Sequence, residues 1–164
     1  MLLYVPMERD PIEELYDRYA AMLYRLALSE LKHRQDAEDA VQAVFEKYVL
    51  APHLFFSREH EKAWMLRVTM NQCRDMLRRR QQRYAVPLDE AADVGVQDAH
   101  SEVLDVLEKL PEDYRVPLTL YYFEDCKVEE IARALGLGPS AVKMRLKRGR
   151  EMMKKELEGE SGHD

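Results

Sequence analysis

A glycine-marked break between two helical patterns constrains the C-terminal part of this 164-residue chain most strongly. The segment 127–155 reads KVEEIARALGLGPSAVKMRLKRGREMMKK. Its first part repeats apolar residues at offsets of three and four, which predicts a short helix with one packing face, while Glu129, Glu130 and Arg133 are expected to face solvent. The residues of this packing face are Val128, Ile131, Ala132 and Leu135. Gly136 suits the left-handed residue that ends a helix, and Pro139 suits the first turn of the next one. A break of about three residues predicts a helix-turn-helix.

The second helix of this motif places cations beside a packing face. Between positions 143 and 155 there are seven Lys and Arg against Glu151 alone, in a protein of net charge −6. This local positive charge indicates DNA as a partner, although a charged helix is often only a solvated face. The packing face comprises Val142, Leu146, Gly149, Met153 and Leu157, and the cationic stripe comprises Lys143, Lys147, Arg150 and Lys154.

A second basic helix is predicted upstream, over residues 63–83. One stripe of this segment is apolar: Ala63, Leu66, Met70, Cys73 and Leu77. The neighbouring stripe combines an aromatic ring, an amide and three guanidinium groups: Trp64, Arg67, Asn71, Arg74 and Arg78. These groups can stack on a base, bond to its edge and hold phosphates. An isolated tryptophan also often packs in a core, and that alternative stays open for Trp64.

The composition favours an all-α protein of two small helical domains. Hydrophobic residues make up 46% of the chain, there are only six glycines, and no segment alternates with the two-residue period of a strand. Residues 84–99 contain no Lys or Arg and show no sustained helical period, so a flexible linker is predicted at 84–100. It would join domains at 8–83 and 101–158. About seven helices are expected.

Several other classes of protein are disfavoured. The two cysteines and five histidines form no metal-ligand motif, and no nucleotide-binding loop or catalytic constellation can be identified, so neither a metal, a cofactor nor an enzymatic activity is expected. No apolar run approaches the roughly 18 residues that span a bilayer, and MLLYVP is too short for a signal peptide, which predicts a cytoplasmic protein without membrane insertion. Both cysteines are expected to be buried or semi-exposed thiols.

Three segments in order resemble the bacterial RNA polymerase sigma factors of the extracytoplasmic-function group (group 4), within the sigma-70 family. They are DAEDAVQAVFEKYV at 36–49, WMLRVTMNQCRDMLRRR at 64–80, and LPEDYRVPLTLYYFEDCKVEEIARALGLGPSAVKMRLKRGRE at 110–151. The resemblance covers roughly residues 15–157 and implies a non-enzymatic factor that directs core polymerase to specific promoters, as an alternative, stress-responsive sigma factor. Ser140, Ala141 and Met144 depart from the family pattern, so the upstream promoter sequence does not follow from relatives.

The resemblance implies a role for each helical surface. Docking on the β′ clamp helices of polymerase would use the outward face of 36–49, whose alternative is a solvated acidic face: Asp36, Asp39, Gln42, Phe45 and Glu46. Minus-ten DNA would be bound by the loop at 52–62 and the helix after it: Phe55, Phe56, Trp64, Arg67, Asn71, Arg74 and Arg78. Minus-thirty-five DNA would be bound by the last helix: Ser140, Lys143, Met144, Arg145, Lys147, Arg148 and Arg150. The polymerase β flap and an anti-sigma factor are the further partners implied.

The sequence leaves some alternatives open, both for single residues and for the function. Asp36 is expected to cap its helix and Ser57 the next one. Phe55 and Phe56 could plug the core instead of capturing a base. A stand-alone helix-turn-helix regulator that dimerises on palindromic sites is the alternative function, and an RNA-binding adaptor is a third.

Overall fold

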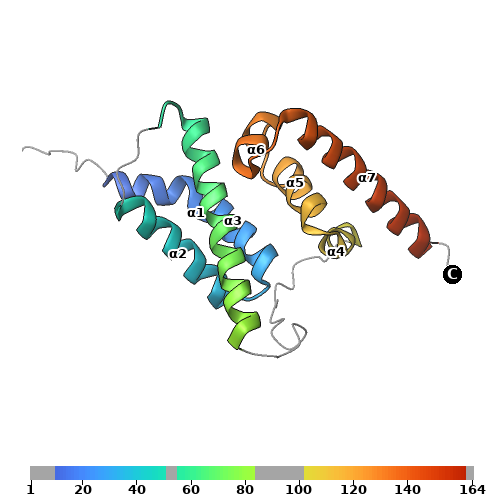
Figure 1. Ribbon diagram of the computed structural model, residues 1–164, viewed down its shortest axis with the longest axis horizontal. Coiled ribbons are helices and arrows are strands. Elements are labelled where there is room, and N and C mark those ends of the chain that lie inside the picture. The colour runs from blue at the N-terminus through green and yellow to red at the C-terminus, as the bar shows by residue number, and fades with distance from the viewer. Residues whose placement is uncertain (1–9, 51–54, 84–101, 162–164) are drawn as a thin grey trace, which may run out of the picture.

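The computed structural model describes residues 10–50, 55–83 and 102–161, most of which lie in seven α-helices (Figure 1). The helices are α1 (Pro11–Leu31), α2 (Arg34–Leu50), α3 (Arg58–Arg83), α4 (Glu102–Lys109), α5 (Glu112–Tyr122), α6 (Val128–Leu135) and α7 (Pro139–Ser161). The expected all-α class and helix number are confirmed for these residues. The linker predicted at 84–100 lies outside the described residues.

The N-terminal half is a bundle of α1, α2 and α3. The Asp10 carboxylate accepts a hydrogen bond from the Ile12 amide at 2.9 Å, and Pro11 occupies the first turn, so α1 begins with a satisfied cap. Lys32 ends α1 in the left-handed conformation. The core residues of α1 recur at helical spacing and are buried: Leu15, Tyr19, Met22, Leu23, Leu26, Ala27 and Leu31. This spacing gives α1 a continuous face for α2 and α3.

The apolar stripe predicted for α3 is confirmed. Ala63, Leu66, Met70 and Cys73 are each at most 2% exposed, and Leu77 is half-buried against the core. The Ser57 hydroxyl accepts a hydrogen bond from the His60 amide at 3.1 Å, as predicted for a helix cap. The helix therefore begins at Arg58, five residues before the start predicted at residue 63.

The C-terminal half contains the predicted helix-turn-helix. Helix α6 ends at Leu135, Gly136 adopts φ 68° in the left-handed region, and α7 begins at Pro139, so the break has the expected length. Val142 and Leu146 are buried, and the backbone of Gly149 closely approaches Leu118 of α5. The absence of a side chain at Gly149 therefore allows α5 and α7 to pack directly together.

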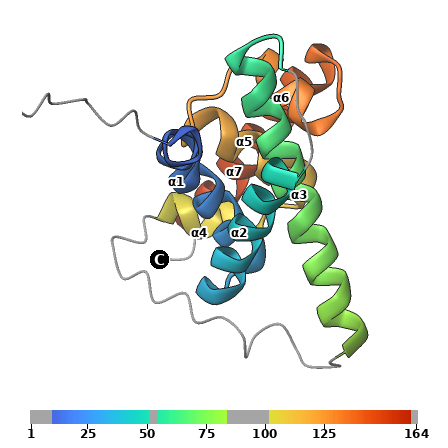
Figure 2. The same cartoon turned by 90° about the vertical axis from the view of Figure 1, so that its left-hand side faces the viewer.

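The two halves pack against each other, with the first turns of α3 lying against α6 (Figures 1 and 2). Buried apolar residues of both halves belong to one continuous cluster. Glu130 of α6, which was expected to face solvent, is only 7% exposed because it lies against α3. That expectation was wrong because the partner helix is remote in sequence.

Both cysteines are free and buried, in agreement with the sequence. Burial raises the pKa of the Cys73 thiol to about 12 and that of Cys126 to about 11, so neither forms a reactive thiolate near neutral pH. No helix in the described ranges is long and apolar enough to cross a membrane.

Gly149→Leu should destabilise the protein, because a Cβ at this position would lie 2.7 Å from Leu118 Cδ1. We expect a loss of about 1–3 kcal/mol in the free energy of unfolding, the usual cost of overpacking a core. Gly159→Leu, later in the same helix and with no atom near its added Cβ, is the matched control and should leave stability unchanged or slightly higher. Urea unfolding measures both, and equal midpoints would contradict the proposed close packing of α5 and α7.

Candidate functional site

An aromatic cluster lies at the start of α3. Trp64 is half-buried, with its ring centroid 5.8 Å from that of Tyr48 and 6.0 Å from that of Phe55. Phe56, in contrast, is 94% exposed and stacks on His60 at 5.9 Å. The alternative of a core plug therefore does not apply to Phe56, while Phe55 and Trp64 form a supported aromatic wall.

A hollow of about 420 Å³ opens beside this wall. Its lining combines the rings of a phenylalanine, a histidine and a tryptophan with two small residues and two arginines: Phe56, Ser57, His60, Ala63, Trp64, Arg67 and Arg133. Stacking surfaces beside guanidinium groups are suited to holding an unpaired nucleotide. Arg133 comes from α6, so the C-terminal half closes one side of this hollow.

The polar stripe of α3 is exposed but engaged with neighbours in the protein. Arg67 donates a hydrogen bond to the backbone carbonyl of Arg133. Arg74 donates to Glu112 of α5 at 3.1 Å, and Arg78 donates to Asp75 at 2.7 Å. Asn71 lies exposed among these cations. The stripe is thus on the surface, as predicted, and two of its three arginines contact the C-terminal half.

The outward face of α2 presents polar groups that are joined by hydrogen bonds. Gln35 Nε2 donates to Asp39 at 3.0 Å, and Gln42 Nε2 donates to Glu46 at 3.2 Å. Phe45 was predicted to be an outward anchor, but it is only 9% exposed and packs against Tyr16 of α1. It can therefore present only an edge to a partner.

Asp36 has a different local role from the one expected. Helix α2 begins at Arg34, so Asp36 lies within its first turn and is not its cap; instead, the His33 side chain accepts a hydrogen bond from the Asp36 amide. The Asp36 carboxylate pairs with Arg80 of α3. The capping prediction was wrong because a basic residue 44 positions away takes the carboxylate.

A groove of about 760 Å³ separates α1 from α2 and was not predicted. It is lined by residues of both helices: Tyr16, Asp17, Ala20, Ala21, Tyr24, Glu38, Val41, Gln42 and Phe45. Tyr16 is 55% exposed and supplies the aromatic surface that Phe45 does not. The spacing of Tyr16 and Tyr24 beside two alanines in α1 was the available sequence signal.

The first turns of α7 form an exposed basic surface. Ser140, Lys143, Met144, Lys147 and Arg148 are all exposed, as a DNA-reading helix requires. Arg145 is half-buried, and its guanidinium lies 3.5 Å from the Asp113 carboxylate of α5.

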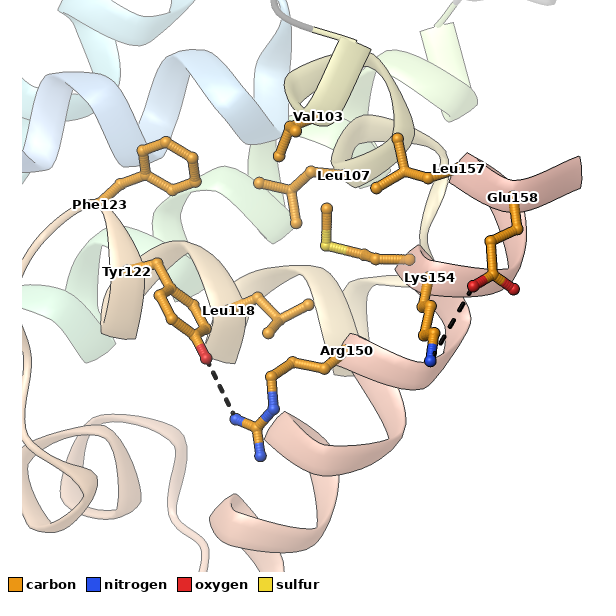
Figure 3. Close-up of a pocket in the computed structure, with 10 residues that line it drawn as sticks. Val103, Leu107, Leu118, Tyr122, Phe123, Arg150, Lys154, Leu157 and Glu158 are labelled. Carbon is orange, nitrogen blue, oxygen red and sulfur yellow. Dashed lines mark hydrogen bonds and ion pairs between the residues drawn. The ribbon is translucent and has the colours of Figure 1, made fainter. Parts of the chain in front are cut away.

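An apolar groove of about 800 Å³ extends along the later turns of α7 (Figure 3). Helices α4, α5 and α7 supply its apolar floor, and cations lie at its border. Arg150 contacts the Tyr122 hydroxyl at 3.3 Å, so this predicted DNA contact borders the groove. Its residues are Val103, Leu107, Leu118, Tyr122, Phe123, Arg150, Met153, Lys154, Leu157 and Glu158. The periodicity of Met153 and Leu157 predicted packing, but could not distinguish a core from an open groove.

Comparison with known families divides the chain in the same way. The family profile of Sigma-70 region 2 matches residues 15–83, and that of Sigma-70 region 4 matches residues 100–153. The RNA polymerase sigma factor SigV of Bacillus subtilis is 32% identical over 139 residues, which cover 82% of this chain and 83% of the relative. The ECF RNA polymerase sigma factor SigM of the same organism is 30% identical, covering 87% of this chain and 93% of the relative.

Solved structures show the same fold. CnrH, solved in complex with the cytosolic domain of CnrY, matches with a TM-score of 0.64 at 25% identity, over 90% of this chain and 88% of that one. The sigma factor RpoE of Bartonella quintana, solved with the anti-sigma factor NepR, matches with a TM-score of 0.71 at 20% identity, over 89% of this chain and 96% of that one.

These matches decide between the functions that the sequence left open. A stand-alone regulator or an RNA-binding adaptor would not require a region 2 followed by a region 4 over most of the chain. Sigma factors are non-catalytic proteins that bind core RNA polymerase and promoter DNA. The chain belongs to the extracytoplasmic-function sigma factors of the sigma-70 family and acts as an alternative sigma factor of RNA polymerase.

Proposed function

We propose that this sigma factor divides promoter recognition and polymerase binding among four surfaces. Helix α2 and the α1/α2 groove dock on the β′ clamp helices, and the Trp64 wall with the α3 stripe holds minus-ten DNA. The first turns of α7 read minus-thirty-five DNA, and the apolar groove receives the β flap. The observation that carries this assignment is the supported aromatic wall next to the guanidinium stripe on α3. Run-off transcription with purified core polymerase tests it directly.

Docking on the clamp helices rests on the shape of the α1/α2 groove. Glu38 gives its α2 side negative charge, and Tyr16 gives the α1 side an exposed ring. An exposed aromatic anchor beside hydrogen-bonding side chains is typical of the few residues that carry most of an interface's energy. Gln42 lines the groove and can exchange its hydrogen bond with Glu46 for one with the partner.

Replacing both Tyr16 and Gln42 with Ala should weaken association with core polymerase at least about tenfold, the effect of losing a little more than 1.4 kcal/mol. Helical content should stay unchanged because both side chains are exposed. Phe45→Ala should instead lower the free energy of unfolding by about 3–5 kcal/mol, since it empties a core site.

Polymerase pull-down and circular dichroism, measured on the same samples, separate the two effects. Glu13→Ala, an exposed change on α1 outside the groove, is the control for binding. A folded double variant that still binds polymerase like the parent would rule out this groove as the docking site.

Minus-ten recognition rests on the chemistry of the α3 stripe. Removing a base from its stack costs a few kcal/mol, which contacts with Trp64 and Phe56 can offset. Asn71 lies exposed between Arg67 and Arg74, where its amide can bond a base edge while the arginines hold phosphates. Phosphate contacts fix position, and base contacts carry specificity.

Asn71→Ala should change the sequence preference at the minus-ten element without changing affinity for core polymerase. Arg78 lies on the same stripe and is assigned to a phosphate contact, so Arg78→Ala should lower transcription from all promoters by a similar factor. Transcription from a library with a randomised minus-ten element ranks the promoter sequences by yield for each variant and for the parent. If Asn71→Ala returned the parent's ranking, base reading by this residue would be excluded.

Minus-thirty-five recognition is assigned to the exposed start of α7. Lys143, Lys147 and Arg148 carry the charge for base edges or phosphates, with Ser140 and Met144 on the same exposed turns. Arg145 would have to break its ion pair with Asp113 before it could contact DNA. Each phosphate contact adds about 0.9 to the logarithmic salt slope, so binding by this helix alone should be weak at physiological salt.

The apolar groove suits a short amphipathic segment of the polymerase β flap. Its floor is apolar, while Arg150 and Lys154 add positive charge at its border. This composition is that of a helix-in-groove site. Docking there would hold α7 in place over the upstream element.

Val103→Glu should abolish the increase in transcription that a minus-thirty-five element gives, because the substitution places a charge in the apolar groove. The position is 44% exposed, so the change should not disrupt the core. Val103→Leu keeps the site apolar and is the matched control. Transcription is measured from paired promoters with and without the upstream element, and the ratio of the two yields is compared between the variants and the parent. If Val103→Glu left this ratio unchanged, the groove would be excluded as a polymerase-binding site.

The proposed modules are residues 8–83 and 101–158, with 84–100 as the linker. An anti-sigma factor that covers these surfaces is the proposed regulator, since both solved relatives named above were determined with a second protein, CnrY or the anti-sigma factor NepR. The cytoplasm, where core polymerase acts, is the proposed location.

A further inference from the structure

The Glu61 carboxylate is enclosed within the N-terminal half and meets three hydrogen-bond donors. The Tyr19 hydroxyl donates to Oε1 at 2.9 Å, and Arg18 Nη1 donates to the same oxygen at 3.2 Å. The Tyr48 hydroxyl donates to Oε2 at 3.2 Å. The Glu61 side chain is only 14% exposed, and a carboxylate so far removed from water is stable only when it is hydrogen-bonded. The donors come from α1 and α2, so Glu61 joins all three helices of the bundle.

The place of Glu61 near the start of α3 does not account for its burial. Acidic residues in the first turn of a helix complement its dipole, and they do so while exposed to solvent. Glu59, in the same turn, has a side chain that is 56% exposed and serves that purpose. Glu61 is instead turned inward, one helical turn before Trp64. The sequence gave no signal for this arrangement, because the three donors lie 13 to 43 residues away.

Both tyrosine hydroxyls remain donors at neutral pH. Burial, together with the neighbouring Glu61 carboxylate, raises the pKa of Tyr19 to about 12. The same two causes raise the pKa of Tyr48 above its ordinary value. A proton lost from either hydroxyl would place a second negative charge beside an enclosed carboxylate. Both hydroxyls therefore keep their protons, and can donate to Glu61, throughout the physiological pH range.

Tyr48 connects this carboxylate to the aromatic wall. Its ring lies edge-on to Trp64, with centroids 5.8 Å apart and an interplanar angle of 73°. The same ring stacks on Phe55 at 6.0 Å and 18°. A tyrosine whose hydroxyl is bonded and whose ring is packed has one favoured orientation. The bond to Glu61 therefore fixes the ring on which Trp64 rests.

A stacking wall is most effective when it is formed before DNA arrives. A base gains by stacking only against a ring that is held in place, and ordering a loose ring during binding costs entropy. Trp64 lines the hollow of about 420 Å³, whereas neither Tyr48 nor Glu61 is among the described residues that line it. Tyr48 and Glu61 thus lie behind the wall and support it.

We propose that Glu61 is a positioning residue for minus-ten opening, and that it acts through its hydrogen bond to Tyr48. In the free protein this bond holds the Trp64 ring ready for an unpaired base. Arg18 and Tyr19 hold the Glu61 carboxylate in turn. The inference rests on the proposed role of Trp64 in minus-ten binding, which it deepens by one layer of residues.

Two hydroxyl deletions at the same carboxylate test the proposal. Tyr48→Phe and Tyr19→Phe each remove one donor to Glu61, so both should lower the free energy of unfolding. Only Tyr48→Phe releases a ring that supports Trp64, because in Tyr19→Phe the Arg18 guanidinium still holds the same oxygen. A purely structural role for Glu61 would make the two variants equivalent in every DNA assay. Tyr114→Phe, the same deletion on a half-buried ring of α5, is the control for both.

Trp64 emission reports the state of the wall directly, because Trp64 is the only tryptophan of the chain. Acrylamide quenching of the full-length protein measures how accessible this ring is to a small solute. Tyr48→Phe should raise the quenching constant, whereas Tyr19→Phe and Tyr114→Phe should leave it at the parent's value. An unchanged quenching constant in Tyr48→Phe would overturn the proposal.

Promoter opening measures the functional consequence. Holoenzyme is formed from purified core polymerase and bound to a duplex promoter recovered from the randomised minus-ten library, and the permanganate reactivity of unpaired thymines is recorded. Tyr48→Phe should lower opening roughly two- to tenfold, the factor to which one aromatic pair corresponds, and Tyr19→Phe should open like the parent. Glu61→Ala removes the acceptor and should match Tyr48→Phe. The double variant should show no further loss of opening, because both changes break one bond.

An opening defect in Tyr48→Phe that Tyr19→Phe lacks, with unchanged association with core polymerase, supports the proposal. Equal opening in these two variants would contradict it, whether or not Glu61→Ala folds. Trp64→Ala separates this result from a failure of the proposed function. If Trp64→Ala opens promoters like the parent, the wall itself takes no part in opening. If Trp64→Ala is defective while Tyr48→Phe is not, only the positioning role of Glu61 is excluded.

Discussion

Helix α3 is packed on two sides, and the rest of the structure depends on this arrangement. Leu66, Met70 and Cys73 fix it in the N-terminal core, while Lys62 and Arg67 hold it against α6. A helix restrained on both sides cannot rotate, so the remaining stripe points in one direction. Packing in the N-terminal core fixes the direction of the stripe before a partner binds, which lowers the entropic cost of binding a flexible partner such as unpaired DNA.

Electrostatic compensation explains how an acidic chain carries basic DNA-binding surfaces. The protein has a net charge of −6, yet its cations gather on α3 and α7. Many of the α3 cations face carboxylates within the protein, including Glu112 and Asp75. Burial raises the pKa of Glu30 although Arg115 opposes the change, so the interface between the halves contains a carboxylate taken out of water only because a guanidinium meets it.

Periodicity predicted the helices well because each packing face is a local pattern. Ala63, Leu66, Met70 and Cys73 repeat at helical spacing, and burial of that stripe follows from the need to remove apolar area from water. Gly136 and Ser57 mark helix ends through local backbone chemistry, and both predictions are confirmed. The predictions that concerned individual side chains at contacts distant in sequence were less accurate.

Phe45, Asp36 and Glu130 illustrate the reason. Phe45 is covered by Tyr16, Asp36 pairs with Arg80, and Glu130 meets Lys62, so in each case the deciding partner lies far away in the chain. The sequence by itself determined the all-α class, the helix-turn-helix and the family resemblance, because these depend on spacing within single segments. Only the tertiary structure decided which cations face carboxylates, where the two grooves open and how α3 meets α6, because burial and ion pairing depend on which helices come together in space.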